Sequence, residues 1–219
     1  MKTSILKKMN YICNCQKENF FDKEYSYWED RNVTSDELDI INFITSFKTI
    51  KLKSILHIGI GNSYLCRNID NNYRVTGITI SKKEINKANS LKLPNYNTYL
   101  CDKYSIEFNS LIKNKKFDLI IDTNLKSYSC CQESFEFMMK NLIESINDNG
   151  MLITSINGMT WFKKLKPKLS FSLKKLFHFK LKEINGNQLN ILTINELNNL
   201  SQNYKLKMSF NDKLCYLKK

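Results

Sequence analysis

The chain has 219 residues, of which 42% are hydrophobic and 12% aromatic, enough to form the core of one domain. No apolar run reaches the ~18 residues of a membrane-spanning helix, and the plentiful aromatic residues argue against a disordered chain. The basic start is not followed by a long apolar stretch, so it does not resemble a secretion signal. We therefore expect a cytoplasmic protein.

The net charge is +13, with 34 Lys and Arg against 21 Asp and Glu. The arginines are Arg31, Arg67 and Arg74, and Ala88 is the single alanine, a composition typical of an AT-rich genome. Two interpretations stay open. The charge is codon drift on a solvated surface, or it was selected for binding an anion such as nucleic acid.

Seven cysteines are an odd number, which fits a reducing compartment better than a secreted disulfide framework. They are Cys13, Cys15, Cys66, Cys101, Cys130, Cys131 and Cys215. A structural zinc ion takes about four ligands. Cys13 and Cys15 form one pair, but no second ligand pair lies near them in the sequence, and His57 and His178 are remote. We therefore predict no metal site, and interpret the cysteines as buried or idle thiols.

The N-terminal part is polar and aromatic, and it ends in a predicted helix. Residues 34–37 place Thr and Ser before two acidic residues, which is typical of a helix start, and apolar residues follow at helical spacing. We interpret residues 1–45 as an N-terminal lid or helical segment, and residues 46–219 as the main domain.

Strands and helices alternate through the main domain. Apolar runs bounded by turn residues predict strands at residues 54–58, 74–80, 96–102, 117–122 and 151–156. Helical spacing predicts a short helix carrying Tyr64, Leu65 and Ile69, a helix capped by Ser81, and helices over 106–112 and 135–146. This alternation over short turns predicts an α/β fold with a parallel sheet covered on both faces.

The sequence changes character at residues 161–182, which hold eight lysines and no acidic residue. We interpret this range as a basic insertion. Thr193 then precedes another predicted helix, and residues 205–210 and 213–217 predict a closing antiparallel hairpin.

The first predicted strand runs into Gly59-Ile60-Gly61, the pattern of a nucleotide-type site. Glycine lets the backbone turn sharply and approach a ligand, while the next helix offers free N–H groups. A dinucleotide site is disfavoured, because Tyr64 stands where a third glycine is needed and no carboxylate ends the second strand at 78–81. No Gly-Lys-Ser/Thr follows, which argues against a phosphate-binding P-loop.

Five segments in register within residues 25–157 resemble class I S-adenosylmethionine (SAM)-dependent methyltransferases. They are 55–62, 75–81 (in a variant also seen in cyclopropane-fatty-acid-synthase-like members), 101–102, 117–122 and 149–153. Residues 27–31 resemble the aromatic-basic segment that closes over SAM in many members. The resemblance implies a seven-stranded Rossmann-like methyltransferase sheet, mostly parallel with a C-terminal antiparallel hairpin and helices on both faces. It also implies SAM as the cofactor and methyl transfer as the activity.

The resemblance implies a set of cofactor-binding residues along these segments. They are Tyr27, His57, Gly59, Gly61, Asn62, Thr79, Ile80, Ser81, Asp102 and Lys103. Asp102 stands where the family places the acidic residue that meets the adenine amino group. A purely structural role is the open alternative for several of these residues. His57 would then be a histidine at a strand end, and Asp102 would cap a turn. Tyr27 and its neighbour Trp28 would be packing residues.

Two positions depart from the family pattern. Many members carry an acidic residue at the positions of His57 and Thr79, the latter to grip both ribose hydroxyls. A hydroxyl at Thr79 makes one such bond without the charge-assisted pair. Ser81 or Lys103 would then compensate, or the chain is a relative that has lost SAM.

Methyl transfer from SAM is an in-line displacement, in which positioning the two reactants supplies ~7–11 kcal/mol of the barrier. An oxygen nucleophile also calls for a base. Asp122, just beyond the fourth strand, is our first candidate, ahead of Lys126, Tyr128 and His178. A loop carboxylate without a catalytic role is the alternative for Asp122.

The acceptor is narrowed by motifs that the sequence lacks. Residues 122–125 do not form the Asp/Asn-Pro-Pro-aromatic motif of DNA amino-methyltransferases, and neither Pro94 nor Pro167 precedes a cysteine. We predict methylation at an oxygen of a small anionic or sugar-like acceptor, such as a glycan precursor.

Two alternatives stay open: an RNA methyltransferase, or a non-catalytic basic module that binds RNA or a membrane surface. Three roles stay open for residues 161–182. They pack on the core, they line the site for an anionic substrate, or they contact RNA or lipid.

Overall fold

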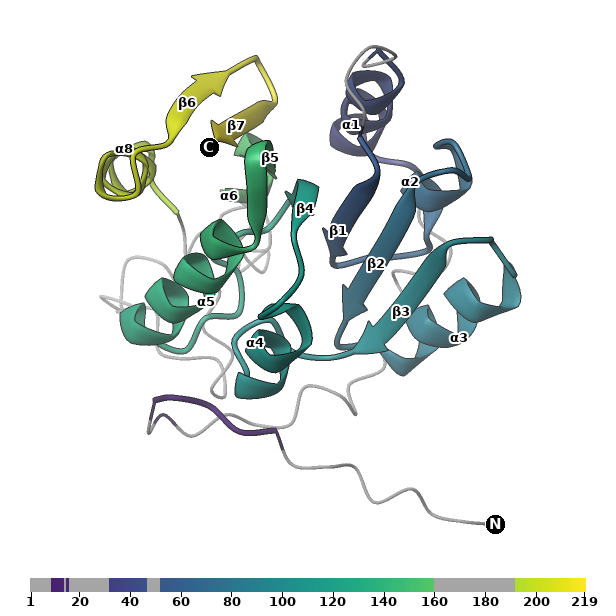
Figure 1. Cartoon of the computed structure of the whole chain (residues 1–219), viewed down its shortest axis with the longest axis horizontal. Helices are drawn as coiled ribbons and strands as arrows, with labels where there is room; N and C mark the ends of the chain where they lie inside the picture. The colour runs from purple at the N-terminus through teal and green to yellow at the C-terminus, as the bar shows by residue number, and fades with distance from the viewer. Residues whose placement is uncertain (1–8, 14, 16–31, 47–51, 160–191) are drawn as a thin grey trace, which may run out of the picture.

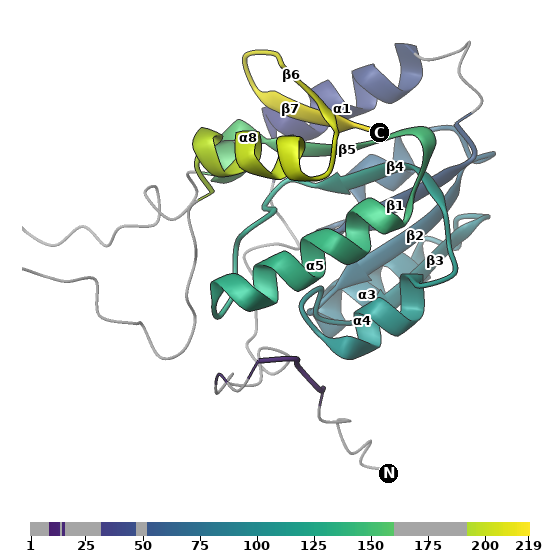
Figure 2. The same ribbon diagram turned by 60° about the vertical axis from the view of Figure 1, so that its left-hand side comes forward.

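The computed structural model describes residues 9–13, 15, 32–46, 52–159 and 192–219, which form one sheet with helices on both faces (Figures 1 and 2). The strands are β1 (Ser54–Ile58), β2 (Arg74–Thr79), β3 (Tyr96–Leu100), β4 (Phe117–Asp122), β5 (Ile146–Ser155), β6 (Lys207–Phe210) and β7 (Leu214–Lys218). The helices are α1 (Ser35–Ser46), α2 (Tyr64–Arg67), α3 (Lys82–Ser90), α4 (Ile106–Ile112), α5 (Gln132–Glu144), α6 (Ile156–Met159) and α8 (Ile194–Asn203). Among the described helices, none combines the length and the apolarity needed to cross a bilayer.

The seven strands lie in the order β3-β2-β1-β4-β5-β7-β6. Strands β1 to β5 pair in parallel, whereas β7 pairs antiparallel with both β5 and β6. The predicted fold class is therefore confirmed, including the C-terminal antiparallel hairpin. The strand order changes direction between β1 and β4, and in open α/β sheets ligands bind beyond the carboxyl ends of the strands at such a point.

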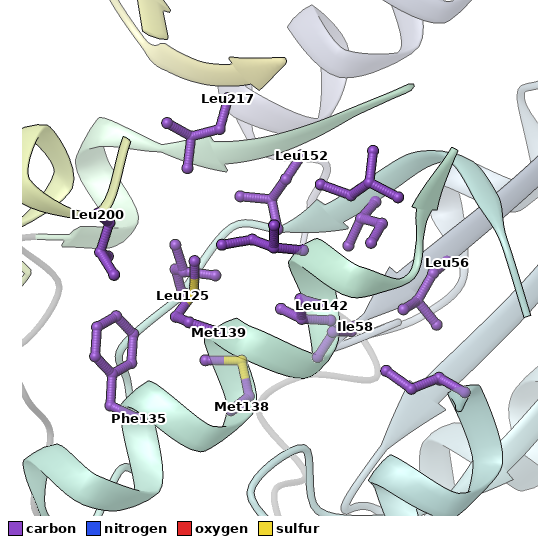
Figure 3. Close-up of a cluster of buried hydrophobic side chains, with 14 of the residues drawn as sticks. Leu56, Ile58, Leu125, Phe135, Met138, Met139, Leu142, Leu152, Leu200 and Leu217 are labelled. Atoms are coloured by element: carbon purple, nitrogen blue, oxygen red, sulfur yellow. The ribbon is translucent and has the colours of Figure 1, made fainter. Parts of the chain in front are cut away.

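Alternate residues of the buried strands face two separate hydrophobic clusters. Ile55 of β1 packs in the cluster beneath α1 and α2, and its neighbour Leu56 packs in the cluster beneath α4, α5 and α8. Figure 2 shows α5 and α8 on one side of the sheet and α1 on the other. Figure 3 shows the second cluster, where Met138, Met139 and Leu142 of α5 lie against the sheet. The sheet is thus buried on both faces, as expected for parallel strands.

Side-chain caps fix where several helices begin. Ser81 accepts a hydrogen bond from the Glu84 N–H at the start of α3, and Ser105 accepts one from the Phe108 N–H at the start of α4. At α8, Thr193 and Glu196 form a reciprocal capping box. The helix starts predicted at Ser81 and Thr193 are therefore confirmed.

The boundary between α5 and β5 differs from the prediction. The sequence predicted a helix to residue 146 that Asn149-Gly150 would end, but α5 ends at Glu144 and β5 already begins at Ile146. A register irregularity opposite Phe117 accommodates this early start. Gly150 fits there because a Cβ would lie 2.9 Å from the Phe117 carbonyl oxygen and 2.8 Å from an Ile146 methyl carbon. Hence this glycine allows close strand packing instead of ending a helix.

Several other predictions differ in detail or lie outside the described residues. β3 ends at Leu100 rather than at residue 102, and α2 ends at Arg67, before Ile69. The predicted lid residues Tyr27 and Trp28, and the range 161–182 that was interpreted as a basic insertion and contains His178, are outside the described ranges. The division of the chain at residue 45 stays a prediction.

Candidate functional site

The glycine bend follows β1 directly. The Gly59 N–H donates to the Ile78 carbonyl 2.8 Å away, which ties the bend to β2. Gly59 and Gly61 have φ values of +75° and +52°, which residues with side chains rarely adopt. A Cβ added at Gly59 would meet no heavy atom of the described part of the chain within 4 Å, so the backbone faces open space there. The predicted glycine turn is present, and nothing from the described chain fills the space in front of Gly59.

Local hydrogen bonds hold the rest of the bend. The Asn62 side-chain oxygen accepts from the Tyr64 N–H at 3.1 Å, at the start of α2. Ser63, whose φ is +60°, shares a 3.1 Å hydrogen bond with the Tyr96 hydroxyl from β3. Asn62 and Ser63 are both buried. The turn is therefore braced against β3 and prepared to present its backbone N–H groups in a fixed direction.

His57 is the next-to-last residue of β1, two positions before Gly59. It is buried, and its Nδ1 lies 3.9 Å from the Cys66 thiol of α2. Burial raises the pKa of Cys66 to about 12, so this partner stays a neutral thiol at physiological pH. His57 thus faces α2 beneath the bend, and its predicted contact with the cofactor stays a prediction.

The carboxyl end of β2 carries a buried hydrogen-bonded group of three residues. The Thr79 hydroxyl donates to the Glu84 carboxylate at 2.5 Å, and the Ser81 N–H donates to the Thr79 hydroxyl at 3.0 Å. Thr79, Ser81 and Glu84 are all at most 8% exposed. Ile80, between them, is half-buried. The structure therefore brings the predicted residues Thr79 and Ser81 together around a carboxylate.

Glu84 is a residue that the sequence analysis missed as part of the site. Many of the methyltransferases that the sequence resembles carry an acidic residue at the position of Thr79, and here a carboxylate from the first turn of α3 reaches that hydroxyl. The pattern Ser81-x-x-Glu84 was the available signal, but it is also an ordinary capping pattern. Glu84 restores negative charge at the end of β2.

Asp102, just after β3, has donors on both carboxylate oxygens. One oxygen accepts from the Tyr104 N–H, and the other from the Tyr11 hydroxyl, each at 3.0 Å. Burial, followed by the neighbouring charge of Asp102, raises the pKa of Tyr11, so that the phenol stays protonated and donates. Asp102 therefore does cap its turn, as the plain interpretation held. It also anchors the N-terminal stretch near Tyr11, and an adenine contact stays a prediction.

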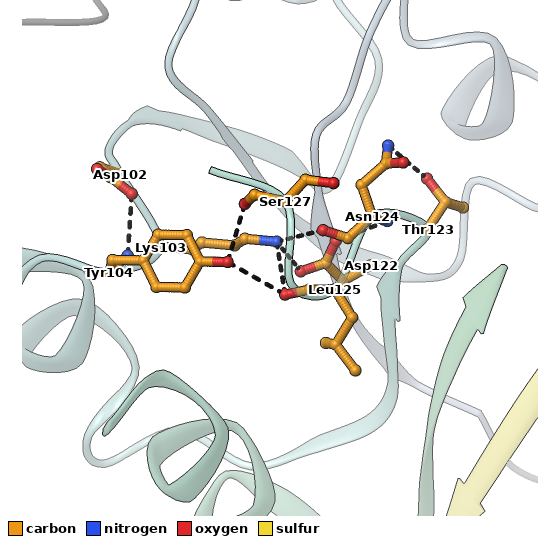
Figure 4. Close-up of polar contacts among 8 residues, drawn as sticks. All are labelled: Asp102, Lys103, Tyr104, Asp122, Thr123, Asn124, Leu125 and Ser127. Atoms are coloured by element: carbon orange, nitrogen blue, oxygen red, sulfur yellow. Dashed lines mark hydrogen bonds and ion pairs between the residues drawn. The ribbon is translucent and has the colours of Figure 1, made fainter. Parts of the chain in front are cut away.

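Lys103 has a structural role that differs from the predicted one (Figure 4). Its ammonium donates to the Asp122 carboxylate at 2.6 Å and to the carbonyls of Asn124 and Leu125 at 2.8 and 3.0 Å. A lysine ammonium has three donors, and all three are used within the chain. The prediction that Lys103 helps to hold the cofactor is therefore not supported by this geometry.

Asp122 is committed to the same network (Figure 4). One carboxylate oxygen pairs with Lys103, and the other accepts from the Asn124 N–H at 3.1 Å. The Asp122 side chain is 3% exposed. A general base needs a lone pair directed at the substrate. The two contacts fix the loop after β4, and the role of Asp122 as a general base stays a prediction.

The weaker base candidates are also placed by the structure. Lys126 is buried and forms an ion pair with Glu196 of α8. Burial alone would raise the pKa of Glu196, but the hydrogen bonds from Lys126 and Thr193 outweigh it and lower that pKa. Tyr128 is half-buried with φ +66°. The ion pair occupies the Lys126 ammonium, and a role of Tyr128 as a base stays a prediction.

Four cysteines meet near the start of α5, which the sequence did not lead us to expect. Cys13 and Cys15 were predicted to lack a second ligand pair, but Cys130 and Cys131 lie next to them. All four sulfur atoms lie within 4.8 Å of one another. The prediction failed because Cys13 and Cys130, in contact at 3.2 Å, are 117 residues apart in the sequence.

Comparisons with known proteins place the fold. No protein-family model matches the chain, and no curated protein is similar to it in sequence. The N-methyltransferase NodS from Bradyrhizobium japonicum WM9, crystallised with S-adenosyl-l-homocysteine, is 11% identical with a TM-score of 0.58, covering 90% of this chain and 93% of that one.

Two further solved structures are similar. The magnesium protoporphyrin IX methyltransferase ChlM from Synechocystis PCC 6803, also crystallised with S-adenosyl-l-homocysteine, is 14% identical, with a TM-score of 0.57 over 88% of this chain and 90% of that one. An O-methyltransferase family protein from Burkholderia thailandensis is 8% identical, with a TM-score of 0.57 over 84% of this chain and 56% of that one. The chain therefore has the fold of class I SAM-dependent methyltransferases.

Proposed function

We propose that this protein is a SAM-dependent methyltransferase. The observation that carries the proposal is the open Gly59-x-Gly61 bend, which lies along one sheet edge with Glu84 after β2 and Asp102 after β3. Backbone N–H groups and carboxylates in this order suit a ligand that joins an amino acid, a ribose and an adenine. The proposal is supported by NodS and ChlM, similar folds that were crystallised with the demethylated product of SAM.

We assign the amino acid part of SAM to the bend. The backbone of Gly59 and Gly61 would approach it closely, because no side chain of the described residues occupies the space in front of Gly59. Asn62 would lie beside it, and His57 would support the bend from the side of α2.

We assign the ribose to the end of β2 and the adenine to the turn after β3. Glu84 would accept the ribose hydroxyls, with Thr79 held against it and Ile80 and Ser81 continuing the wall. A carboxylate offers about four lone-pair sites. Asp102 therefore retains acceptor capacity for the adenine amino group besides its two intramolecular donors.

SAM supplies a methyl group activated by a sulfonium. The chain's residues bind the cofactor, orient it and exclude water, which is the larger part of the catalysis. The acceptor oxygen forms a bond to the methyl carbon as the sulfonium–carbon bond breaks, and the sulfur keeps the electron pair. Any proton on that oxygen passes to solvent.

We propose a small anionic or sugar-like acceptor, methylated at oxygen. Asp122 is pinned by Lys103, and Lys126 is paired with Glu196, which makes both poorly suited to act as a base. An acceptor oxygen that is already anionic does not need one. The net charge of +13 would also favour an anionic acceptor. The likeness to cyclopropane-fatty-acid-synthase-like members concerns residues 75–81 alone, and we propose no such activity.

Calorimetric titration with SAM and with S-adenosyl-homocysteine tests cofactor binding. We expect Glu84→Gln to weaken binding roughly 10- to 100-fold, because it removes a charge-assisted acceptor for the ribose. Glu144→Gln, at a side chain that is 64% exposed on α5, is the matched control and should bind like the wild type. Folded protein that binds neither ligand at millimolar concentration would overturn the proposal.

Transfer of a radiolabelled methyl group tests the acceptor class. We expect label in small anionic molecules of a cell extract, with a shallow dependence on salt. Label in total RNA, lost steeply as salt rises, would instead identify an RNA methyltransferase. Equal binding of unrelated polyanions without any transfer would identify a non-catalytic module.

A further inference from the structure

Four thiols from two distant stretches of the chain converge. Cys13 and Cys15 belong to the N-terminal stretch, and Cys130 and Cys131 belong to the loop that leads into α5, where Cys131 is the N-cap. The Cys13 and Cys130 sulfur atoms are 3.2 Å apart, and those of Cys130 and Cys131 are 3.8 Å apart. The four sulfur atoms all lie within 4.8 Å of one another.

We propose that these four cysteines bind one thiophilic divalent ion, most naturally Zn²⁺. Zinc–sulfur bonds of about 2.3 Å in a tetrahedron place the four sulfur atoms roughly 3.8 Å apart. The observed separations bracket this value, so four bonds need only small side-chain adjustments. An iron–sulfur cluster would require wider separations, because its own atoms lie between the ligand sulfurs.

The other described cysteines provide a contrast. Cys66, Cys101 and Cys215 are each buried at separate places in the fold, and burial raises the pKa of each thiol. In the four-cysteine cluster Cys15 is exposed, and Cys130 and Cys131 are partly exposed. An ion can therefore reach the cluster from solvent, and on binding the four thiols release their protons to water.

The ion would fasten the N-terminal stretch to the sheet edge. Asn10 already exchanges hydrogen bonds with α4: its N–H donates to Glu107, and its carbonyl accepts from the Ile106 N–H at 2.8 Å. Tyr11 donates to Asp102. Figures 1 and 2 draw this stretch in purple near α4 and α5. We infer a structural metal that holds Tyr11 against Asp102, and this inference stands whether or not SAM is the ligand.

Metal content and Co²⁺ titration of the full chain test the proposal. Protein purified under reducing conditions should retain one zinc ion per chain. Metal-free protein should take up one Co²⁺ and develop the intense visible bands of tetrahedral thiolate coordination. The double variant Cys13→Ser/Cys130→Ser should lose the bands, with affinity reduced by more than the roughly 10–100-fold that loss of an outer-shell partner costs.

Cys215→Ala is the matched control, because it removes a thiol from the core cluster away from the proposed site, and it should keep one ion per chain. Wild-type protein that retains no zinc and develops no cobalt bands would overturn the proposal. So would bands that persist in the double variant, or a disulfide between Cys13 and Cys130 in the reduced preparation. These measurements on the wild type stand even if a variant fails to fold.

Hydrogen exchange tests the proposed fastening. Removing the metal from the wild type should speed exchange at the Asn10 and Ile106 amides at least tenfold, whereas the amide of Ile120 in β4 should be unaffected. In Cys13→Ser/Cys130→Ser those two amides should already exchange quickly. Unchanged protection of Asn10 after metal removal would contradict the inferred structural role.

Discussion

The carboxyl ends of β2 and β4 each carry a buried carboxylate, but the two are held differently. Glu84, beside β2, receives the hydroxyl of Thr79. Asp122, which ends β4, receives the ammonium of Lys103, and that ammonium also binds two carbonyls of the following loop. A hydroxyl can be exchanged for a ligand's hydroxyl at small cost, whereas a buried ion pair cannot be opened without leaving a charge behind.

We infer that the end of β2 is suited to binding a ligand, whereas the end of β4 has a structural role. The end of β2, next to the open glycine bend, offers an acceptor that a ligand can use. The end of β4 is closed by internal bonds, so we infer that it fixes the loop after β4.

Lys103→Met should lower the free energy of unfolding by about 3–5 kcal/mol, because it leaves the Asp122 carboxylate buried and unpaired. Urea denaturation measures this. The double variant Lys103→Met/Asp122→Leu should recover most of the loss. Lys140→Met, at a side chain that is 62% exposed, is the control and should change stability by less than about 0.5 kcal/mol. If Lys103→Met lowered the free energy of unfolding as little as Lys140→Met does, the Lys103–Asp122 pair would not have the structural role inferred for it.

Two glycine variants near the end of β2 compare a closely packed position, Gly77, with one that faces open space, Gly59. A Cβ at Gly77 would lie 2.9 Å from side-chain carbons of both Ile60 and Tyr96, so Gly77→Ala should cost roughly 1–3 kcal/mol through overpacking. Gly59→Ala has room but a φ of +75°, and should cost about 1–2 kcal/mol. Thermal unfolding with calorimetry compares the two.

Binding of S-adenosyl-homocysteine sharpens the distinction between them. Gly59→Ala should weaken binding by more than its effect on stability, since the added methyl points into the space assigned to the ligand. Gly77→Ala, whose added methyl group would press on Ile60 and Tyr96 and not enter the space in front of Gly59, should weaken binding less than Gly59→Ala does. Equal losses of affinity in both variants would show that the bend is not the binding surface.

Asp118 extends the comparison to a carboxylate at the opposite end of β4 that is held by neutral donors. Burial raises its pKa, but hydrogen bonds from Lys53 and Ser54 backbone N–H groups and from Asn147 outweigh this and lower it. Because the folded pKa lies below the unfolded one, stability is present above the unfolded value and declines as pH falls through the folded value. Asp118→Asn should flatten this acid decline.

Unfolding free energies measured from neutral pH down through the usual range for aspartate check the Asp118 prediction. Asp148→Asn, at an exposed residue, is the control and should keep the wild-type slope. If the free energy of unfolding of Asp118→Asn fell with decreasing pH as steeply as that of the wild type, other carboxylates would account for the loss of stability in acid.

The sequence predicted best what depends on near neighbours. The cap at Ser81, the helix over residues 106–112 and the strand over 117–122 follow from periodicity and local hydrogen bonding, and all three are confirmed. The start of β5 was missed, because pairing of Ile146 with Phe117 overrides the turn signal of Gly150.

The contents of the site depended on contacts that the sequence does not display. Glu84 looked like a capping residue, and its contact with Thr79 arises only when α3 turns back over β2. Lys103 was expected to compensate for the missing acidic residue at the position of Thr79, but its ammonium reaches Asp122 at the end of β4. The four-cysteine cluster joins residues more than a hundred positions apart, which no local pattern reveals.

The strand order at the far edge of the sheet has a consequence for folding. β6 precedes β7 in the chain, yet β7 lies between β6 and β5. Until β7 docks, β6 has no partner strand in this sheet and the hydrogen-bonding edge of β5 is bare. Bare edges of this kind invite pairing with other chains. Partly folded molecules in which β7 has not docked should therefore be the species most prone to aggregate.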